Sequence, residues 1–580
     1  MSPSTCKTRR WVCEPVDDQL IKDFAGRQGL PYLPALVLWK RGYRDEDSVR
    51  RFLNPSFEHL YDPFKLPDME RAVERLLDAQ RRGERVLVHG DYDVDGVTGT
   101  ALLLRGLHRL GIDADFYLPH RMKEGYGLSA KAIDAAKESG ASLILTVDCG
   151  ITAVEEARMA GKAGIDLLIT DHHEPGENLP QAVAVVDPKR ADSTYPFAEL
   201  AGVGVAYKLL EALSRRLGES SEPLQADLDL VALGTIADVA PLIDENRVFA
   251  RFGLEEISKA SKPGLAALLE VSRLAGKSIT ATNVAFGLAP RLNASGRMAD
   301  SKQALKLLLS TDLEEARSLA VKLDQHNRNR RQTEDVILEQ ASILAEHEIK
   351  ERNPRVLVCC RSDWHEGVIG IVASRLVDDY YRPTILLAEK EGRLKGSARS
   401  VPGFHLYEAL LAVREYLVTF GGHEVAAGLV MEKANLKAFT QAINEHASSY
   451  PESVFEPRLR LEAEVELGDF DSETREFFER FRPFGMGNPQ PCFATSGLEI
   501  VGTPRVFGRN HLKFTVRKDK TTVPVLAFGK SELILKLEPG RKEALDVAYR
   551  IAEDSYWGKQ RMQLIAKDLK LRYEPEDFGV

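Results

Sequence analysis

The stretch that decides the fold is Val86-Leu-Val-His-Gly-Asp-Tyr-Asp-Val-Asp-Gly-Val97. A short apolar run, typical of a buried strand, ends in His89, Asp91, Asp93 and Asp95, and an apolar helix-like segment follows. Carboxylates this close together repel one another unless a positive charge lies among them. Because carboxylate oxygens and imidazole nitrogens bind divalent cations, the stretch predicts a metal-binding loop at the end of a strand.

Two other kinds of loop begin in a similar way. An EF-hand calcium loop also starts Asp-x-Asp-x-Asp-Gly, but its twelfth position requires Glu, and counting from Asp91 gives Leu102. Phosphatases of the haloacid dehalogenase type resemble the stretch from Asp93 to Thr98 more closely. In those enzymes the strand runs directly into the first Asp, whereas His89-Gly-Asp-Tyr92 intervenes here. Both alternatives therefore fit the stretch less well than a different metal-binding loop.

Length and composition describe an ordinary folded protein. A chain of 580 residues predicts about four domains of ~150 residues each. The composition, 44% hydrophobic and 28% charged, excludes global disorder. A net charge of −9 argues against a protein wrapped wholesale in nucleic acid, but it allows a local basic groove. Six cysteines without a CxxC pair, and no long apolar run, predict a cytoplasmic protein that does not enter a membrane.

Strand-like runs alternate with helical stretches from residue 86 to 186, which predicts a mostly parallel, doubly wound sheet. In such sheets ligands bind beyond the carboxyl ends of the strands. Metal-binding side chains follow two further strands and one helix. They are Asp148 after the strand at 143–147, Asp171, His172 and His173 after the strand at 167–169, and Asp238 at the end of a helix that starts near Leu228. We expect these side chains to meet the first cluster at one edge of the sheet.

The segment that follows residue 310 predicts a long helix. Thr311 as its cap, with Glu314 three residues later, matches a capping box. A helix that continued to about Ile349 would be roughly 57 Å long at 1.5 Å per residue. Its centre, residues 324–335, is polar on all sides. Such a helix typically bridges two domains through solvent.

The two ends of the chain differ in character. Residues 1–75 are expected to form an N-terminal extension packed on the next domain, and residues 354–450 resume an α/β pattern. From about residue 455 strands dominate, with a hairpin-like turn at Ser555–Lys559. The strand from His511 to Arg517 alternates apolar residues with mostly basic ones, so one of its faces is basic. This pattern suits a small barrel such as an OB-fold, which binds single-stranded nucleic acid.

Taken together, these motifs resemble those of a known family. The cluster at 89–95, Asp148-Cys-Gly, Asp171-His-His173 and Thr235-Ile-Ala-Asp238 look like the four motifs of the DHH phosphoesterase superfamily. Further stretches resemble the RecJ family of single-strand-specific 5′ exonucleases. They are Phe52-Leu-Asn-Pro, Leu66-Pro-Asp-Met-Glu, Pro119 to Leu128, Asn293-Ala-Ser-Gly-Arg-Met298, Trp364 to Gly370 and Phe420-Gly-Gly-His423. The resemblance runs from about residue 50 to the C-terminus.

The resemblance implies an α/β fold in which two α/β domains are joined by a long helix and followed by an OB-fold barrel. The expected boundaries are a 1–75 extension, a 76–300 DHH catalytic domain, a 301–350 connecting helix, a 351–450 DHH-associated domain and a 451–580 nucleic-acid-binding OB-fold.

The resemblance also implies two-metal phosphodiester hydrolysis. One ion would be held by His89, Asp93 and Asp148, and the second by Asp95, Asp148, His172 and Asp238, so that Asp148 bridges them. Asp91 either binds a metal or orients a ligand. The expected catalytic residues are Asp93, Asp95, Asp148, His172, His173 and Asp238. His173 would either protonate the leaving oxygen or hold the phosphate, or it would orient the metal ligands. Two imidazoles among carboxylates favour Mn²⁺, with Mg²⁺ as the alternative.

A pocket for the 5′ phosphate is implied as well. Arginine suits such a pocket because its planar fork binds phosphate through two hydrogen bonds. The expected residues are Arg121, Asn293, Arg297, Ser397, Arg399, Gly422 and His423. The apolar run after His423 (Val425–Leu429) is expected to be helical, so that the backbone N–H groups of Gly421-Gly-His423 cradle a phosphate at a helix N-terminus.

The function implied is degradation of single-stranded DNA from 5′ to 3′ into mononucleotides, in DNA repair and recombination. The bridging helix and the basic β domain could together form a clamp that admits one strand and excludes a duplex. Single-strand-binding protein and a helicase are expected partners of a monomeric enzyme. The alternatives are a DHH-family oligoribonuclease or small-nucleotide phosphodiesterase, and a non-catalytic DNA-binding relative; every ligand position of the family pattern is filled here.

Overall fold

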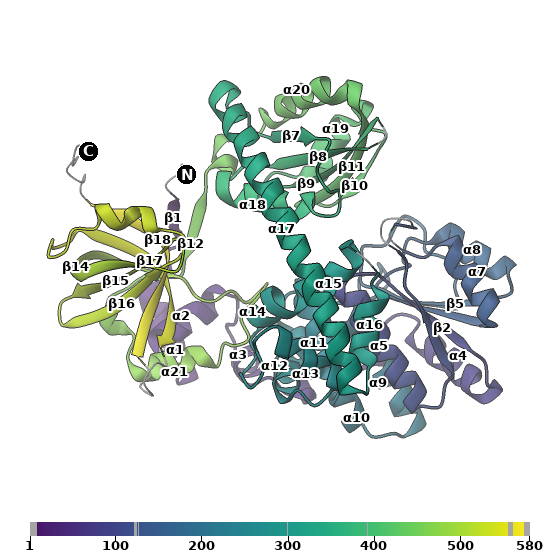
Figure 1. The fold of residues 1–580 in the computed structure, drawn as a ribbon. Helices are drawn as coiled ribbons and strands as arrows, with labels where there is room; N and C mark the ends of the chain where they lie inside the picture. The colour runs from purple at the N-terminus through teal and green to yellow at the C-terminus, as the bar shows by residue number, and fades with distance from the viewer. Residues whose placement is uncertain are drawn as a thin grey trace.

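The computed structural model describes residues 9–120, 124–125, 127–298, 300–390, 392–554 and 561–572. Figure 1 shows an α/β body at the lower right, a smaller α/β body above it and a barrel at the left. One long helix, α17 (Leu313–Arg352), joins the two α/β bodies. The predicted fold class, two α/β domains with a connecting helix and a C-terminal barrel, is confirmed.

The first α/β domain is built on a five-stranded parallel sheet in the order β3-β2-β4-β5-β6. Both faces of this sheet are covered, which is why its strands read as continuous apolar runs. Helices α4, α5 and α9 share a core with one face, and α7 and α8 with the other. The strands are β2 (Val86–Gly90), β3 (Ala114–Tyr117), β4 (Leu143–Val147), β5 (Asp166–Thr170) and β6 (Ala184–Val186); the helices are α4 (Met69–Arg82), α5 (Val94–Arg109), α7 (Ala130–Ser139), α8 (Val154–Lys162) and α9 (Gly202–Leu217).

A helical layer completes this domain. Its central member is α11 (Leu228–Ala237), whose residues from Leu228 to Ile236 are all buried and which packs against α5, α9 and α12. Because α11 ends at the carboxyl-end edge of the sheet, it carries Asp238 there as its C-cap residue. The other elements are α10 (Glu222–Gln225), α12 (Asp244–Lys259), α13 (Pro263–Val271), α14 (Ala281–Asn283), the π-helical turn η3 (Val284–Leu288), α15 (Ala289–Met298) and α16 (Lys302–Leu309).

The connecting helix α17 differs from its prediction in two respects. Its cap is Asp312, whose carboxylate accepts a hydrogen bond from Glu315 N, so the expected capping role of Thr311 is wrong. The polar centre is also not surrounded by solvent, because Asn327 and Glu334 are each only 1% exposed. One face of this polar stretch packs against neighbouring helices and is satisfied by ion pairs, namely Arg291 with Asp324, Arg330 with Glu334, and Arg375 with Glu334.

The second α/β domain contains a five-stranded sheet in the order β10-β11-β9-β8-β7. Residues 426–429 of the segment predicted to be helical belong instead to strand β11, which forms a hairpin with β10. The alternate burial of Ala427, Leu429 and Met431 explains why the run forms a strand. The elements are β7 (Leu357–Arg361), α18 (Ile369–Tyr380), β8 (Thr384–Lys390), β9 (Arg393–Arg399), α19 (Leu406–Ala412), β10 (Thr419–Gly422), β11 (Ala426–Glu432) and α20 (Leu436–Ala447).

The C-terminal sheet closes into a barrel, since β14 pairs with both β15 and β17. In β15 the side chains of Leu512, Phe514 and Val516 are buried, which confirms the predicted alternation. The hairpin-like turn at 555–559 lies outside the described residues, although the strands on its two sides pair antiparallel as expected. The strands are β13 (Ala463–Glu464), β14 (Phe493–Phe507), β15 (His511–Lys518), β16 (Thr521–Ala527), β17 (Leu545–Asp554) and β18 (Arg561–Leu571).

The predicted N-terminal extension, residues 1–75, divides into two parts. Its second part, from Phe57 to Val73, packs in the core of the next domain, as predicted. Its first part packs on the barrel, contrary to the prediction. Helices α1 (Asp18–Gln28), α2 (Tyr32–Lys40) and α3 (Glu46–Leu53) share one hydrophobic core with the barrel strands and α21 (Ser472–Glu479). In addition, β1 (Arg10–Cys13) pairs in parallel with β12 (Arg458–Leu461). The described helices include none that combines the length and apolarity needed to cross a membrane.

Candidate metal centre

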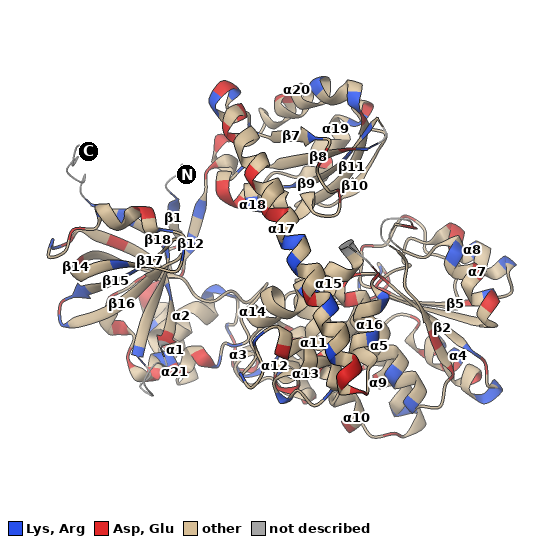
Figure 2. Cartoon of the chain, viewed as in Figure 1, with Lys and Arg blue, Asp and Glu red and all other residues tan. Residues whose placement is uncertain are grey.

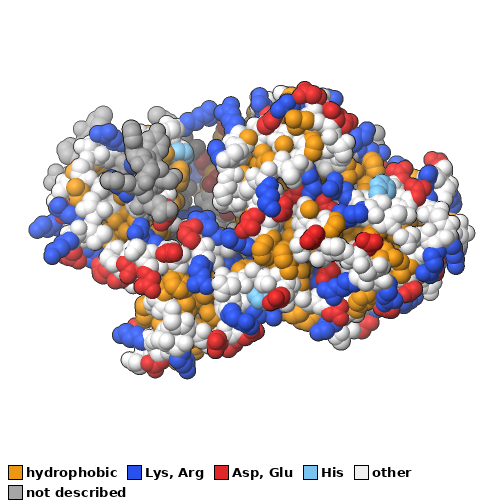
Figure 3. Space-filling view, turned by 90° about the horizontal axis from the view of Figure 1, so that it is seen from below, with side chains coloured by type: hydrophobic (Ala, Val, Ile, Leu, Met, Phe, Trp, Pro, Cys, Tyr) orange, Lys and Arg blue, Asp and Glu red, His pale blue; other side chains and the backbone are white. Residues whose placement is uncertain are grey.

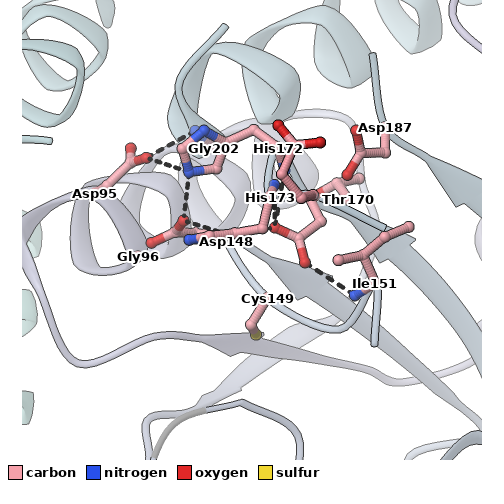
Figure 4. Close-up of polar contacts among 12 residues, drawn as sticks. Asp95, Gly96, Asp148, Cys149, Ile151, Thr170, His172, His173, Asp187 and Gly202 are labelled. Atoms are coloured by element: carbon pink, nitrogen blue, oxygen red, sulfur yellow. Dashed lines mark hydrogen bonds and ion pairs between the residues drawn. The ribbon is translucent and has the colours of Figure 1, made fainter. Parts of the chain in front are cut away.

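The predicted ligands meet at the carboxyl-end edge of the first sheet. Strand register places His89 beside Thr146, and Thr146 beside Ile169, so the segments that leave β2, β4 and β5 begin at one level. Figure 4 shows Asp95 of α5, Asp148 of the loop after β4, and His172 and His173 of the loop after β5 close together. Three sets of side chains bring their ligand atoms within 4.8 Å of one another: Asp91, Asp93 and Asp148; Asp95, His172 and Asp238; and Asp148, His172 and His173.

His172 lies at the centre of the second set. Its Nε2 atom is 3.1 Å from Asp148 Oδ1, 3.8 Å from Asp95 Oδ2 and 3.9 Å from Asp238 Oδ2. Burial lowers the pKa of His172 to about 3, so the ring is neutral at pH 7 and a nitrogen lone pair is available for a metal. A neutral imidazole surrounded by three carboxylates is a donor set suited to a divalent cation.

Asp148 is placed by an unusual backbone conformation. Its φ of 62° lies in the left-handed region, which is uncommon for a residue other than glycine. The first residue of α9 is Gly202, where an added Cβ would lie 2.6 Å from Asp148 Cβ, so only glycine lets α9 begin this close. Sequence reasoning missed Gly202, because the close approach is created by the fold. Asp148 belongs to two of the three sets, one with Asp91 and Asp93 and the other with His172 and His173.

The carboxylates of the site destabilise one another's charged forms. Burial, followed by repulsion from Asp95 and other aspartates, raises the pKa of Asp148 well above its ordinary value. Burial and the negative charges of Asp238 and Asp93 do the same to the pKa of Asp95. The pKa of Asp238 rises to about 7, again mainly through burial. A bound cation would remove this repulsion.

The surroundings of His89 leave one of its ring nitrogens available as a possible metal ligand. It is fully buried, and burial lowers its pKa to about 4, so the ring is neutral. Its Nδ1 atom lies 3.4 Å from Cys149 Sγ, while its buried Nε2 atom has no hydrogen-bond partner among the described residues. A buried polar atom without a partner is costly and requires an explanation, and a metal ion supplies one. Cys149, which the sequence analysis did not single out, therefore orients this ring.

Asp93 and Asp95 also hold the surrounding backbone. Asp93 is the N-cap of α5, and its Oδ1 accepts hydrogen bonds from the N–H groups of Asp95 and Gly96. The Asp95 carboxylate accepts from Gly202 N at 2.7 Å and Val203 N at 2.9 Å, at the start of α9. Each carboxylate is thus fixed in position before any ligand binds.

Asp171, which is buried, pairs with His173, which is partly exposed. Asp171 Oδ1 accepts a hydrogen bond from His173 Nδ1 at 2.7 Å, and Oδ2 accepts one from Ile151 N at 2.9 Å. Burial lowers the pKa of His173, but the hydrogen bond and charge of Asp171 outweigh it and raise that pKa to about 9. His173 is therefore a cation at neutral pH, 3.9 Å from Asp148 Oδ1. The first residue of the Asp-His-His motif orients the third.

Two of the residues predicted to bind phosphate, Ser397 and Arg399, lie side by side in the second domain. Arg399 Nη1 donates to Ser397 Oγ at 3.2 Å on β9. An added Cβ at Gly370, near the start of α18, would lie 2.7 Å from Ser397 Oγ and 3.1 Å from Arg399 Nη2, so glycine keeps this space open. In the first domain, Asn293 Oδ1 accepts from Val94 N at 3.2 Å and so contacts the metal-binding loop.

Of the four other expected members of the pocket, two lie in a β-hairpin, and the side chains of the other two lie outside the described residues. The helix N-terminus predicted after His423 does not exist, because this segment is a β-hairpin in which His423 N donates to Ala426 O at 2.8 Å. Gly422 lies at the end of β10 in that hairpin. Arg121 lies outside the described residues, as does the side chain of Arg297.

Comparison with known protein families gives the class to which this fold and site belong. The family model for the N-terminal domain of the DHH family matches residues 85–235, and the DHHA1 domain model matches 353–449. The RecJ OB domain model matches 461–568. The fold and the site thus define a DHH phosphoesterase with a C-terminal OB domain.

Individual relatives show to which family within this class the chain belongs. The chain is 39% identical to the single-stranded-DNA-specific exonuclease RecJ of Bacillus subtilis, over 96% of this chain and 70% of the relative. It is 34% identical to the protein of the same name from Escherichia coli, over 93% of this chain and 96% of the relative. A crystal structure of RecJ with Mn²⁺ from Thermus thermophilus matches with a TM-score of 0.81 at 32% identity, over 97% of this chain and 79% of that chain. The chain belongs to the RecJ family.

Proposed function

We propose that this chain removes nucleotides from the 5′ end of single-stranded DNA with two divalent cations bound at the edge of the first sheet. Membership of the RecJ family makes it a metal-dependent exonuclease specific for single-stranded DNA, and degradation from 5′ to 3′ in DNA repair fits that family. The observation that carries the two-ion proposal is the position of His172 Nε2, within 4 Å of carboxylate oxygens on three aspartates from separate parts of the chain.

The donor set fits two ions that share Asp148. His89, Asp93 and Asp148 would hold the first, and Asp95, His172 and Asp238 would complete the second. Asp91 lies with Asp93 and Asp148 in one set, which favours it as a further ligand of the first ion. Divalent ions at such a site neutralise phosphate charge and activate water for attack. The two imidazoles favour Mn²⁺ over Mg²⁺, because Mg²⁺ prefers oxygen ligands and retained waters.

His173 is the cationic side chain of the site. Because its Nδ1–H is held by Asp171, its other ring nitrogen is directed away from that carboxylate. A protonated Nε2 can hold a phosphate oxygen or give its proton to the leaving 3′ oxygen. Asp171 is a positioning residue, since it acts through His173.

We assign recognition of the 5′ end to residues of the second domain, together with a few residues of the first domain. Arg399 and Ser397 offer a guanidinium and a hydroxyl side by side, and a terminal phosphate carries more charge than an internal one. Asn293, Gly422 and His423, together with Arg121 and Arg297, remain proposed contacts from the sequence. The domain boundaries given above, a monomeric state and partnership with single-strand-binding protein and a helicase also remain predictions.

The test compares 5′-phosphorylated single-stranded DNA, single-stranded RNA, duplex DNA and dinucleotides, each with Mn²⁺, with Mg²⁺ and with EDTA. We expect release of mononucleotides from the 5′ end of single-stranded DNA, fastest with Mn²⁺ and absent with EDTA. Preferential cleavage of dinucleotides over long DNA would instead identify a small-nucleotide phosphodiesterase.

A further inference from the structure

Strand β7 is an edge strand of the sheet in the second α/β domain, where its one partner among the described strands is β8. Leu357 N donates a hydrogen bond to Pro383 O at 2.8 Å, just before β8. In a parallel ladder every second residue bonds to the neighbouring strand, so Leu357 and every second residue after it bond to β8. The backbone N–H and C=O groups of Val356, Val358 and Cys360 therefore point away from the sheet.

A side chain closes the first of these three outward-facing residues. Asn444, on α20, accepts a hydrogen bond from Val356 N at 3.0 Å and donates one to Val356 O at 3.1 Å, as a neighbouring strand would. In the described part of the chain, no side chain or loop is hydrogen-bonded to the backbone of Val358 or Cys360. Unpaired groups along an edge strand form a template on which another strand can pair.

The edge strand β6 of the first sheet is treated differently. At its central residue, Val185 N donates to Asp68 Oδ2 at 3.2 Å, and Val185 O accepts from Arg190 Nη1 at 2.6 Å. Proteins commonly protect edge strands in such ways against pairing with other chains. The open groups on β7 are therefore a departure from the protection that this chain gives to β6.

A cavity of about 1070 Å³ lies along the open edge of β7. It is lined by Val358 and Cys360 of β7, by Leu344 of α17 and by Leu436 of α20, among others. Helix α17 shares a core with one face of β7 and α20 with the other, and Figure 1 shows β7 between these two helices. The space between the helices beyond β7 therefore has the thickness of one sheet, which is the thickness of one added strand.

The cavity carries an excess of positive charge, although the whole chain has a net charge of −9. Its lining includes four cationic and two acidic side chains, namely Arg352, Arg355, Lys433, Lys437, Glu348 and Glu445. Arg352 lies 3.8 Å from Glu348, and Lys433 lies 2.9 Å from Glu389. Figure 2 shows basic positions on α20 and at the end of α17. On the face of the molecule seen in Figure 3, by contrast, basic and acidic side chains are interspersed.

The two walls of the cavity indicate the sequence of a strand that fits it. Successive side chains of an added strand point alternately toward α17 and toward α20. Lys433 and Lys437, at the start of α20, favour acidic side chains on their side. On the α17 side Glu348 and Arg352 balance each other beside Leu344, which favours apolar side chains. The matching strand is thus alternately acidic and apolar.

Other occupants fit the cavity less well. A second copy of β7 would bring its own cations against those of the first copy, and like charges repel. A nucleic acid would use the cations, but it has no N–H and C=O groups at the spacing of a strand. The backbone groups of Val358 and Cys360 would then stay without partners.

We propose that the open edge of β7 is a docking site for an extended, alternately acidic and apolar segment of another protein, which adds a sixth strand to the sheet. Strand β7 lies at the opposite edge of the sheet from β10, and β8 separates it from β9, which carries Ser397 and Arg399. Docking therefore leaves the residues predicted to bind phosphate free. The proposal does not depend on the proposed function, because binding of the segment requires neither metal nor DNA.

The first test uses a fluorescein-labelled peptide of eight residues that alternates Glu and Val. It is titrated onto the full chain in EDTA, and binding is followed by fluorescence anisotropy. We expect saturable binding, no binding of a peptide that alternates Lys and Val, and at least tenfold weaker binding of four Glu followed by four Val. The absence of saturable binding below about 1 mM would overturn the proposal.

The second test removes main-chain hydrogen bonds without changing the protein. The Glu–Val peptide is N-methylated either at every Glu or at every Val, so that only one set blocks the N–H groups that face β7. We expect one set to weaken binding about 30-fold, since two main-chain hydrogen bonds are lost, and the other to be tolerated. Loss at Glu indicates an antiparallel strand and loss at Val a parallel one. Equal effects of the two sets would overturn strand addition.

The third test locates the peptide on the chain. Lys433→Gln/Lys437→Gln should weaken binding about fivefold, the effect of two exposed ion pairs. The matched control, Lys322→Gln/Lys350→Gln, removes the same charge from exposed positions of α17 outside the cavity and should change binding less than twofold. Hydrogen exchange of residues 356–361 should slow about tenfold at the amides of Val358 and Cys360 when the peptide binds. Equal effects of the two double variants, or unchanged exchange, would contradict the site.

The remaining arms identify the rival occupants. Light scattering over a range of concentrations detects dimers of the chain, and a dimer that the Glu–Val peptide dissociates would make a second copy the occupant. A 5′-phosphorylated single-stranded 40-mer is added to the peptide complex in EDTA. Competitive displacement of the peptide by this DNA would place the peptide in the substrate site. Either result would overturn the proposal.

Discussion

His172 Nε2 lies 3.1 Å from Asp148 Oδ1, although the two side chains leave the sheet from different strands and both are buried. The contact joins a neutral imidazole to a carboxylate whose pKa is raised by burial and by other aspartates. An imidazole nitrogen and a carboxylate oxygen held this close together are two possible ligand atoms for one cation. This relationship links the end of β4 to the end of β5 and defines the centre of the site.

Asp148→Asn is expected to lower kcat/KM at least ~1,000-fold with either Mn²⁺ or Mg²⁺, because a shared ligand of both proposed ions is lost. The matched control is Asp134→Asn on the exposed side of α7, which should be neutral. Retention of more than a tenth of the activity by Asp148→Asn would refute the bridging role.

Stabilisation by Mn²⁺ is expected to increase with pH. The folded pKa of Asp238 is about 7 against an ordinary 3.8, so without metal its contribution to stability is present below pH 3.8 and is lost as the pH rises to about 7. Metal competes with these protons, and its stabilisation reaches about 2.7 kcal/mol at a hundred times Kd. Thermal melts at pH 5.5 and 8 should therefore show a larger Mn²⁺-induced rise in Tm at pH 8. A rise that is the same at both pH values contradicts the assignment.

Asp171→Asn should reduce kcat about 100-fold and leave Mn²⁺ affinity, measured by calorimetry, nearly unchanged. The asparagine cannot hold His173 as a cation, but it removes no proposed ligand. Because the two residues act as a unit, the double variant Asp171→Asn/His173→Ala should be no slower than His173→Ala alone. Additive losses would show that Asp171 has a separate role.

Arg247→Met tests how the barrel is joined to the catalytic domain. The buried guanidinium of Arg247, on α12, donates to the carbonyl oxygens of Phe52, Arg480, Phe481 and Arg482, and it lies 4.0 Å from the centre of the Phe52 ring. Losing these bonds leaves buried carbonyl groups unpaired, at about 3 kcal/mol. Chemical denaturation should show this loss, whereas Arg251→Met, a partly exposed position on the same helix, should be nearly neutral. Equal stabilities would contradict the role of Arg247.

The sequence allowed the sheet, the ligand types and their meeting point to be predicted, because apolar periodicity and the chemistry of strand ends are local properties. Contacts between residues that are far apart in the sequence could not be predicted in this way. Gly202 matters only because α9 begins against Asp148, and Cys149 because it lies beside His89. The polar centre of α17 was misread since its ion-pair partners, such as Arg291 and Arg375, are distant in sequence. The run after His423 was misread because a short apolar segment has no clear period.

The most direct test of the two-ion centre is anomalous diffraction at the manganese absorption edge from crystals grown with Mn²⁺. We predict two peaks roughly 3.5–4 Å apart, as is usual for such centres. Both should lie within bonding distance of Asp148, one beside His89 and Asp93 and the other beside His172 and Asp238. A single peak, or two peaks of which only one contacts Asp148, would contradict the account.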